Sequence, residues 1–151
     1  MRIYLNELVP EGLVVEGDLP PEIMDAAEND PVMVDGPIHC RLRAMDVTGE
    51  LIVEGELSAP LKFRCRRCDG TYVSTLDKLP YHYNQALESV PEYVDLTNDI
   101  REAMIIAFPL YPVCRPDCKG LCPQCGANKN ETQCDCKPPA ENRWAALSGL
   151  K

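Results

Sequence analysis

The cysteines constrain this sequence more than any other feature. Six of the nine cysteines fall between Cys114 and Cys136, and the other three are Cys40, Cys65 and Cys68. Nine is an odd number, so complete disulfide pairing within one chain is impossible. Clustered cysteines at short, regular gaps are typical of metal sites in reducing compartments. We therefore expect these cysteines to bind metal.

Cys65 and Cys68 form a CxxC motif with strand-like sequence on both sides and Gly70 shortly after it. Two thiolates at this spacing can bind one metal ion from a tight turn, as in a zinc knuckle. Redox dithiols use the same motif, but they normally place it where a helix begins after a strand. The flanking strands therefore favour a metal knuckle, in which Gly70 lets the backbone fold under the ion.

A closed zinc site needs four ligands, so the knuckle needs a second pair of thiolates. We expect Cys114 and Cys118, which follow a strong helix signal, to supply this pair. The remaining CxxC and CxC pairs can meet because the segment between them is short and turn-forming. A different partition, in which residues 114, 118, 122 and 125 share one ion, stays open. The preferred scheme has two zinc ions, with Cys65, Cys68, Cys114 and Cys118 at site 1 and Cys122, Cys125, Cys134 and Cys136 at site 2.

Four thiolates fill a tetrahedron and leave no open position for water or substrate, so we expect structural zinc. An iron–sulfur cluster, which also accepts four cysteines, is the alternative. The sequence has no glycine-rich phosphate loop, GxSxG or HExxH motif, and we expect no catalytic residues, no enzyme activity and no small-molecule substrate. Cys40 lies on an apolar strand face and is expected to be a small buried hydrophobe. His39 and His82 lie away from the clusters and are expected to be surface or packing residues.

The rest of the chain predicts an α+β fold, mainly an antiparallel β-meander with one packed helix. Apolar residues alternate from Ile38 to Ala44 and again from Leu51 to Cys65, and 71–85 reads as a further strand. The first 20 residues look extended, 21–30 a short helix and 86–95 a loop.

A helix is expected at about 97–108, with Thr97 or Asp95 as its cap and an apolar stripe facing the core. We expect a β-rich body over 1–112 and a cysteine-rich zinc-binding tail over 113–151, packed together as one unit. Trp144, Leu147 and Leu150 share a face near the end of the tail and are expected to dock on the body.

The net charge of −9 excludes nucleic-acid binding by the whole surface, because such affinity comes largely from neutralising phosphates. Contact with RNA must therefore be local or made through a basic partner. A local basic patch surrounds the knuckle, and Arg41 and Arg43 on a neighbouring strand are expected to extend it. An equally weighted alternative is that these side chains balance the negative thiolate centre. The patch consists of Lys62, Arg64, Arg66 and Arg67.

The N-terminus has no secretory signal pattern, and no stretch approaches the roughly 18 apolar residues that span a bilayer. These observations predict a cytoplasmic protein that does not bind membranes.

The order of motifs resembles the YceD-like family of bacterial proteins, also called large ribosomal RNA subunit accumulation proteins. The matching stretches are CRRC at 65–68, DLTNDIREAMIIAFPLYPVC at 95–114, CKGLCPQCGANKN at 118–130, CDC at 134–136 and ENRWAALSGL at 141–150. The resemblance implies a role in large-subunit ribosomal RNA accumulation and ribosome assembly, but it supplies no chemistry. Some family members lack the CxxC–CxC quartet, and the resemblance therefore implies two separable metal sites.

The expected function is therefore that of a non-enzymatic zinc-binding protein that supports assembly of the large ribosomal subunit. Its expected partner is ribosomal RNA or a basic large-subunit assembly protein. The alternative is a thiol–zinc redox switch or a redox-regulated chaperone-like protein, since a CxxC close to a CxC also occurs, in reverse order, in the redox-regulated heat-shock chaperone.

Overall fold

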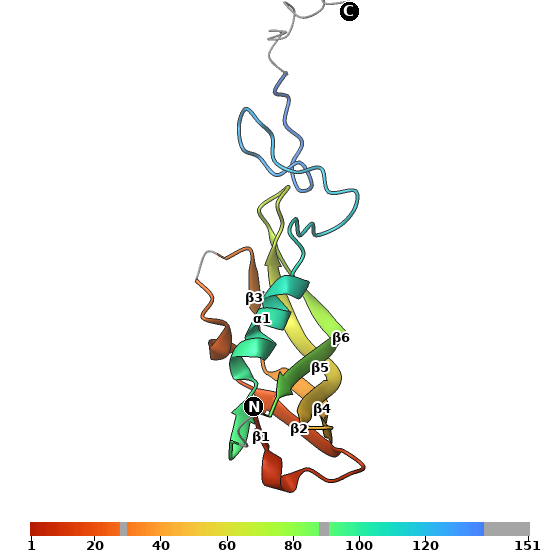
Figure 1. The fold of residues 1–151 in the computed structure, drawn as a ribbon. Helices are drawn as coiled ribbons and strands as arrows, with labels where there is room; N and C mark the ends of the chain where they lie inside the picture. The colour runs from red at the N-terminus through yellow and green to blue at the C-terminus, as the bar shows by residue number, and fades with distance from the viewer. Residues whose placement is uncertain (28–29, 88–90, 138–151) are drawn as a thin grey trace, which may run out of the picture.

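A long hairpin runs through most of the molecule and sets its elongated shape (Figure 1). The computed structural model describes residues 1–27, 30–87 and 91–137. Within them, the hairpin consists of β5 (Glu50–Arg64) and β6 (Thr71–Ala86), which pair antiparallel along almost their whole length. The tip of the hairpin is the CxxC turn, so the fold carries this motif to one end of the body.

Three further strands complete the sheet: β2 (Leu13–Leu19), β3 (Val32–Val34) and β4 (Ile38–Val47). β4 pairs with the first half of β5, β3 pairs with its second half, and β2 pairs with β4. Thr48 and Gly49 join β4 to β5, and both have positive φ (55° and 84°), which suits a tight two-residue hairpin turn. The predicted antiparallel meander is confirmed, since every pairing in this sheet is antiparallel.

One face of the sheet is buried. Side chains along β4 alternate, so that His39 and Arg41 are exposed while their neighbours in sequence are buried. The same alternation runs along β5 from Leu51 to Phe63. The period of two in the sequence therefore marked the core face correctly, and the buried residues of β4 are Ile38, Cys40, Leu42 and Ala44.

Helix α1 (Thr97–Ala107) packs on the core through the fully buried Ile100 and Met104. The carboxylate of Asp95 accepts hydrogen bonds from the N–H of Thr97 (3.0 Å) and from its hydroxyl (2.6 Å), which stabilises the first turn. The buried Tyr81 of β6 donates its hydroxyl to Asp99 (2.7 Å) and links the helix to the hairpin. The helix predicted at about 97–108 is confirmed.

The expected loop over 86–95 is wrong at its end. β7 (Tyr93–Asp95) pairs antiparallel with β1 (Arg2–Tyr4), and Ile3 lies opposite Val94. Both of these side chains are buried, but a strand of three residues with one buried side chain is too short to show alternation. Residues 88–90 of this segment lie outside the described residues.

Two other local predictions were only partly right. The extended segment over 1–20 is interrupted by a 3-10 turn at Leu5–Glu7. The helix expected over 21–30 is a single 3-10 turn at Pro21–Met24, which ends because Asp25 takes a left-handed conformation (φ 48°). Residues 28–29 lie outside the described part of this segment.

Within 1–27, 30–87 and 91–137, no helix is long and apolar enough to cross a membrane. The proposed docking of Trp144, Leu147 and Leu150 falls outside the described residues. Figure 1 shows the segment after α1 returning to the hairpin tip and continuing beyond it. The division of the chain at residue 112 stays a prediction.

Candidate metal centres

The turn at the tip of the β5–β6 hairpin is built by local backbone hydrogen bonds. The N–H of Cys65 donates to the carbonyl of Gly70 (2.9 Å), and the N–H of Asp69 donates to the carbonyl of Cys65 (3.0 Å). The left-handed residue in this turn is Asp69 (φ 60°), so Gly70 does not have the role expected of it. Asp69 also pairs with Arg64 through both carboxylate oxygens (2.6 and 2.8 Å), which fixes the strand ends around the two thiols.

The segment after α1 brings a second pair of thiols to this turn. The N–H of Arg66 donates to the carbonyl of the buried Pro112 (2.9 Å), and the N–H of Cys114 points at the sulfur of Cys65 (3.4 Å). Arg67 donates its guanidinium to the carbonyls of Pro116 (3.1 Å) and Cys118 (3.3 Å). The tail is therefore held against the knuckle by its backbone as well as by its cysteines.

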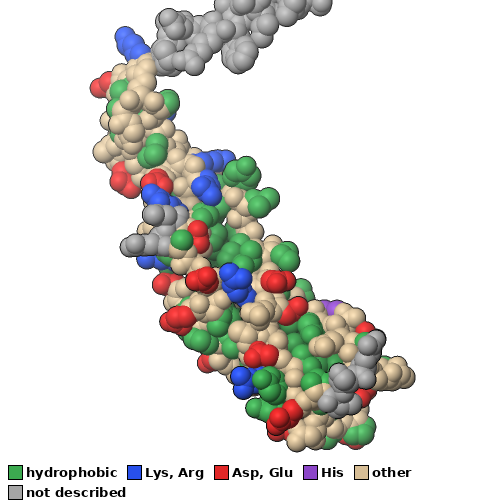
Figure 2. All heavy atoms as spheres, turned by 60° about the vertical axis from the view of Figure 1, so that its left-hand side comes forward, with side chains coloured by type: hydrophobic (Ala, Val, Ile, Leu, Met, Phe, Trp, Pro, Cys, Tyr) green, Lys and Arg blue, Asp and Glu red, His purple; other side chains and the backbone are tan. Residues whose placement is uncertain are grey.

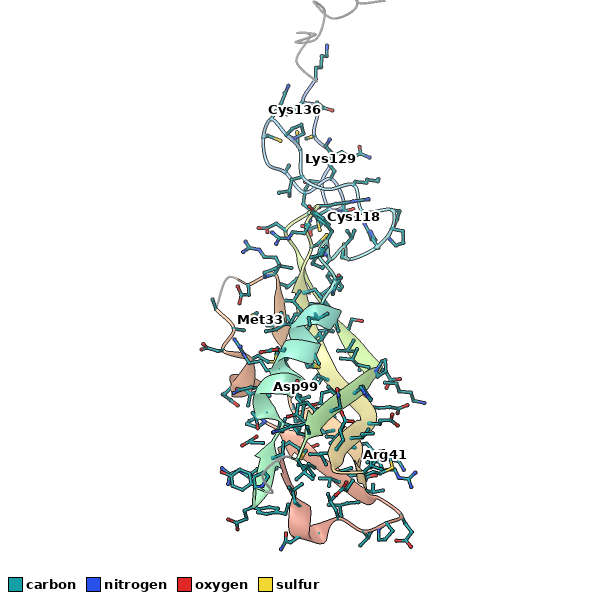
Figure 3. All side chains as sticks on the ribbon, viewed as in Figure 1. Met33, Arg41, Asp99, Cys118, Lys129 and Cys136 are labelled. Atoms are coloured by element: carbon teal, nitrogen blue, oxygen red, sulfur yellow. The ribbon has the colours of Figure 1, made fainter. Side chains whose placement is uncertain are left out.

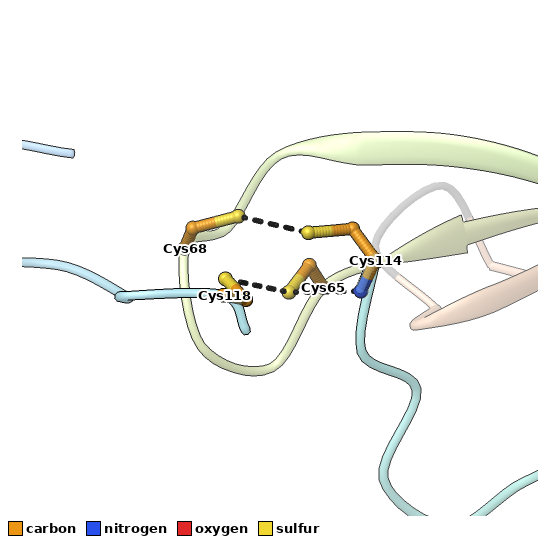
Figure 4. A group of neighbouring side chains, drawn as sticks. All are labelled: Cys65, Cys68, Cys114 and Cys118. Carbon is orange, nitrogen blue, oxygen red and sulfur yellow. Dashed lines mark hydrogen bonds between the residues drawn. The ribbon is translucent and has the colours of Figure 1, made fainter. Parts of the chain in front are cut away.

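We call Cys65, Cys68, Cys114 and Cys118 the inner quartet. Their four sulfurs lie within 4.8 Å of one another, with 3.9 Å between Cys65 and Cys118 and 3.8 Å between Cys68 and Cys114 (Figure 4). A tetrahedral zinc ion with Zn–S bonds of about 2.3 Å would separate its sulfurs by about 3.8 Å, whereas a disulfide needs about 2.05 Å. The donor set and its spacing therefore fit a tetrahedral metal ion.

The inner thiols differ in acidity because they are so close together. Burial opposes ionisation of Cys65, but hydrogen bonds from the N–H groups of Cys114, Cys68 and Arg67 lower its pKa to about 6. Burial and hydrogen bonds to the neighbouring cysteines raise the pKa of Cys114 to about 12. Protein groups alone thus favour a mixture of thiolate and thiol, and a divalent cation would supply the charge that four thiolates need.

We call Cys122, Cys125, Cys134 and Cys136 the outer quartet; their sulfurs also lie within 4.8 Å of one another. The N–H groups of Cys125 and Gln124 lower the pKa of Cys122 to about 6, and the hydrogen bond with Cys125, then burial, raise the pKa of Cys136 to about 12. Cys125 and Cys136 are exposed, whereas three members of the inner quartet are buried. The outer quartet can hold a metal ion, but solvent reaches it more easily.

Gly120 joins the two quartets where the tail crosses the knuckle. Its φ is +71°, and an added Cβ would lie 2.9 Å from the carbonyl oxygen of Arg67. The next residue, Leu121, donates its N–H to the same oxygen (3.0 Å). Glycine is therefore needed here both for its backbone conformation and for the close approach.

The structure groups the cysteines as the preferred scheme does, and not as 114, 118, 122 and 125 around one ion. That these eight residues bind metal stays a prediction. The ninth cysteine, Cys40, is buried in the core, where burial raises the pKa of its thiol to about 11. His39 and His82 are exposed and lie beside Asp18 (2.6 Å) and Glu54 (3.5 Å) respectively.

The residues expected to contact RNA differ in their availability. Arg64 is paired with Asp69, and Arg67 is bonded to the tail carbonyls. Lys62 is half-buried within β5, and Arg66 is exposed beside a hollow of about 410 Å³ next to the end of α1. Contact of these four residues with RNA stays a prediction; all three arginines are exposed, and among the described residues only Arg64 and Arg67 of the three have side-chain partners.

Arg41 and Arg43 do not extend this patch. β4 pairs with residues 50–58 of β5, which places Arg41 opposite Glu56 and eight residues along the strand from Arg64. At about 3.3 Å per residue this is on the order of 26 Å. Figure 3 shows Arg41 on the body, far from Cys118. Sequence alternation gave the face of these arginines correctly but not their position along the hairpin.

Sequence reasoning missed three residues around the two cysteine quartets. Asp69 fixes Arg64, Gly120 allows the tail to cross the knuckle, and Asn130 donates its side-chain amide to the sulfur of Cys118 (3.4 Å). A glycine two residues after Cys118 was a visible signal of a tight approach. The contact of Asn130 left no comparable signal, since asparagine is also common in ordinary turns.

The chain was compared with known protein families. The family model described as large ribosomal RNA subunit accumulation protein YceD matches residues 73–151, which include most of β6, all of α1 and all six cysteines of the tail. This chain belongs to the YceD family. The match begins after Cys65 and Cys68, so the knuckle lies outside it.

Individual relatives include an uncharacterized bacterial protein and two plant proteins that carry the family's name. An uncharacterized protein of Mycobacterium tuberculosis is 32% identical over 120 residues, which are 70% of this chain and 58% of that protein. The maize protein named large ribosomal RNA subunit accumulation protein YCED homolog 1, chloroplastic, is 41% identical over 58 residues, 38% of this chain and 20% of its own length. The Arabidopsis thaliana protein of the same name is 31% identical over 59 residues, 38% of this chain and 18% of its own length.

The chain thus spans about half the length of the mycobacterial relatives that it matches, 58% for the M. tuberculosis protein and 49% for the M. leprae protein. No solved structure matches the chain.

Proposed function

We propose that this YceD family protein is a non-enzymatic, zinc-stabilised factor that supports accumulation of large-subunit ribosomal RNA. The family description and the names of the maize and Arabidopsis relatives support the process. The observation that carries the molecular part is the inner quartet, in which two distant segments place four sulfurs at the edge length of a tetrahedral zinc–thiolate site. The protein would then act by recognition, with its metal as a structural element.

Zinc is the metal that this donor set favours. Soft thiolate ligands select zinc or iron–sulfur clusters among the common biological metals, and four thiolates leave no coordination position for substrate. The residues that would hold the ions are the two quartets. Elemental analysis of the purified, reduced protein should find two zinc ions per chain. One zinc ion per chain would reject the scheme with two zinc sites, and iron or no metal would reject zinc altogether.

Charge favours a basic protein as the direct partner over naked RNA. Segments 62–72 and 109–137, which form the tip, contain eight Lys or Arg and four Asp or Glu residues. Two zinc–tetrathiolate centres, each with a formal charge of −2, would cancel this excess. The basic side chains that Figure 2 shows near the junction of tip and body would then balance the metal centres. The rest of the chain is strongly acidic, which suits a basic ribosomal protein.

The two kinds of partner can be separated by salt-dependent binding measurements. We expect weak binding to purified large-subunit RNA, unchanged by Arg66→Ala, and tighter, salt-sensitive binding to basic large-subunit proteins. Arg41→Ala is the matched control, because Arg41 is an exposed arginine on the body. Loss of RNA affinity in the Arg66 variant alone, with the salt slope reduced by about one, would show direct RNA contact instead.

The proposed process is tested in cells that lack the protein. We expect less large-subunit ribosomal RNA relative to small-subunit RNA, restored by the wild-type chain and not by a variant with Cys65→Ser and Cys114→Ser. Cys40→Ala is the matched control, because this cysteine is buried in the core away from both quartets. An unchanged RNA ratio in the cells without the protein would reject the process.

The exposure of Cys125 and Cys136 favours a second candidate function, a thiol–zinc redox switch. In this scheme each hydrogen peroxide oxidises two thiolates to one disulfide, takes up two protons and leaves as two waters, and the zinc ion is released. Mild peroxide treatment with simultaneous measurement of free zinc tests the idea. Retained zinc and unmodified thiols would reject it.

A further inference from the structure

One side chain of residues 126–133, which we call the outer segment, contacts the inner quartet. Asn130 lies between the two cysteine pairs of the outer quartet in sequence, yet its Nδ2 donates to the sulfur of Cys118 at 3.4 Å. Cys118 is buried and belongs to the inner quartet. A hydrogen bond to a metal-binding sulfur stabilises its thiolate form and orients it toward the ion. The outer segment therefore supplies a hydrogen bond to one sulfur of the inner quartet.

Asn130 is held in this orientation by several hydrogen bonds. Its Oδ1 accepts from the N–H of Lys119 (2.9 Å) and from the guanidinium of Arg115 (2.9 Å), so the amide nitrogen points away from these donors and donates to the sulfur of Cys118 (3.4 Å) and to Oδ1 of Asn128 (2.8 Å). Its backbone N–H donates to Oδ1 of Asn128 (3.0 Å). Both donors to Oδ1 belong to the segment that carries Cys118, so the amide of Asn130 bonds to this segment through its oxygen as well as its nitrogen.

The segment that carries Asn130 is anchored at both ends by the outer quartet. Residues 126–133 connect Cys125 to Cys134, and Lys129 bonds back to the carbonyl of Gly120 (2.9 Å). Figure 3 shows Lys129 between Cys118 and Cys136. A metal ion in the outer quartet would fix both ends of this segment and favour the conformation in which Asn130 reaches Cys118. Without that ion, only the hydrogen bonds would hold the segment.

We propose that metal binding at the outer quartet controls how long the inner quartet retains its metal, with Asn130 as the positioning residue that links them. This inference depends on the proposed function, in which both quartets bind zinc. The coupling is reciprocal in free energy, so metal at the inner quartet also strengthens binding at the outer one. The outer site thereby regulates the stability of the junction between tail and body.

The test measures zinc transfer from the loaded full chain to a chromophoric chelator. The wild type should release zinc in a fast phase from the exposed outer quartet and a slow phase from the inner one. Replacing Cys125 and Cys136 by serine should leave one zinc, released about 10- to 100-fold faster than the wild-type slow phase. Asn130→Ala keeps all eight thiols and should speed the slow phase about tenfold.

Two further variants separate positioning from general destabilisation. Asn130→Asp keeps the acceptor for Lys119 and Arg115 but removes the amide donor to Cys118 and Asn128, and it should release inner zinc at least as fast as Asn130→Ala. Gln133→Ala, which alters an exposed side chain of the same segment, should behave as the wild type. In the cobalt-substituted protein, Asn130→Ala should shift the thiolate-to-cobalt charge-transfer band, because that band reports the electron density on sulfur.

The possible results distinguish this inference from the proposed function. Two bound zinc ions with a slow phase that neither Asn130→Ala nor the double serine variant alters would overturn the coupling and leave metal binding intact. An accelerated slow phase in the Gln133 control as well would also overturn it, because the effect would then be general loosening. A chain that binds no metal at either quartet would overturn both.

Discussion

Replacing Gly120 by alanine should destabilise the protein more than replacing Gly126 by alanine. The two glycines have almost the same backbone conformation, with φ of +71° and +73°. An added Cβ at Gly126 meets nothing within 4 Å, whereas at Gly120 it would lie 2.9 Å from the carbonyl oxygen of Arg67. The pair therefore separates the cost of a left-handed alanine from the cost of crowding between tail and knuckle.

The expected magnitudes follow from these two costs. A left-handed conformation costs an alanine roughly 1–2 kcal/mol, which is the whole effect expected for Gly126→Ala. At Gly120 the clash partner is a backbone oxygen that also accepts the N–H of Leu121 (3.0 Å), so relief requires the tail to move off the knuckle. Weakening that hydrogen bond adds about 1 kcal/mol, and displaced packing adds a similar amount. We expect a total loss of about 3–4 kcal/mol for Gly120→Ala.

The assay is denaturant unfolding followed by far-ultraviolet circular dichroism at a buffered concentration of free zinc. Gly49→Ala is a second control, because Gly49 has φ of +84° and open space in the β4–β5 turn. Zinc release from the inner quartet should also accelerate in Gly120→Ala and stay unchanged in Gly49→Ala. Equal losses of unfolding free energy for Gly120→Ala and Gly126→Ala would refute the close crossing of the tail over Arg67.

Three further predictions concern the body. Tyr81→Phe should cost about 1–2 kcal/mol of unfolding free energy, because it leaves Asp99 without its buried donor. A similar loss in Asp99→Ala, which removes the acceptor, would support this, and an unchanged midpoint in Tyr81→Phe would contradict it. Hydrogen bonds from Thr97 lower the pKa of Asp95 to about 2. The ionised carboxylate therefore adds to the free energy of unfolding above about pH 4, and this addition disappears as the pH falls toward 2. Asp95→Asn should therefore lose at most about 1 kcal/mol at neutral pH, since the side chain is 42% exposed, and should converge with the wild type near pH 2; a pH-independent difference would contradict this reasoning. Cys40→Ala should leave zinc content unchanged and cost about 1 kcal/mol, and any loss of zinc would show that Cys40 is a ligand.

The parts of the fold that could be predicted are those in which apolar residues recur at the spacing of a strand or of a helix. Along β4 and β5 the strands bury one face over many residues, so the alternation between Ile38 and Phe63 is long enough to read. Helix α1 has both a stop at Pro109 and buried residues four apart, Ile100 and Met104. The cysteine groups could be predicted for a similar reason, because the short spacings between metal-binding cysteines are visible in the sequence itself.

The parts that could not be predicted depend on partners that are distant in sequence. β1 and β7 are three residues each and pair across about 90 positions, which no local pattern reveals. The charge of Arg64 was visible, but its pairing with Asp69 depends on the left-handed turn that brings the two together. The amide of Asn130 is likewise positioned by Arg115 and Lys119, and only their folded arrangement selects its role.

The two quartets connect different parts of the chain, so a metal ion would stabilise different contacts at each of them. Cys65 and Cys118 are 53 positions apart, so a metal at the inner quartet closes a long loop and joins the tail to the body. The outer quartet spans only Cys122 to Cys136, so a metal there closes a short loop within the tail. In the loop-entropy account, the longer closure removes about 1 kcal/mol more conformational freedom from the unfolded chain.

A consequence is that metal loss should affect the protein unequally. Loss of the inner metal should free the tail from the hairpin tip, where Arg66 and Pro112 now bond, while the β-sheet core keeps its own packing. Loss of the outer metal should leave the tail attached but loosen the contact of Asn130. Native-state hydrogen exchange tests this ordering, because removing the outer ligands should expose the amides of 126–133 and leave the N–H of Cys114 protected. If that amide exchanges as fast as those of the outer segment, the two metal centres form one cooperative unit and the hierarchy is wrong.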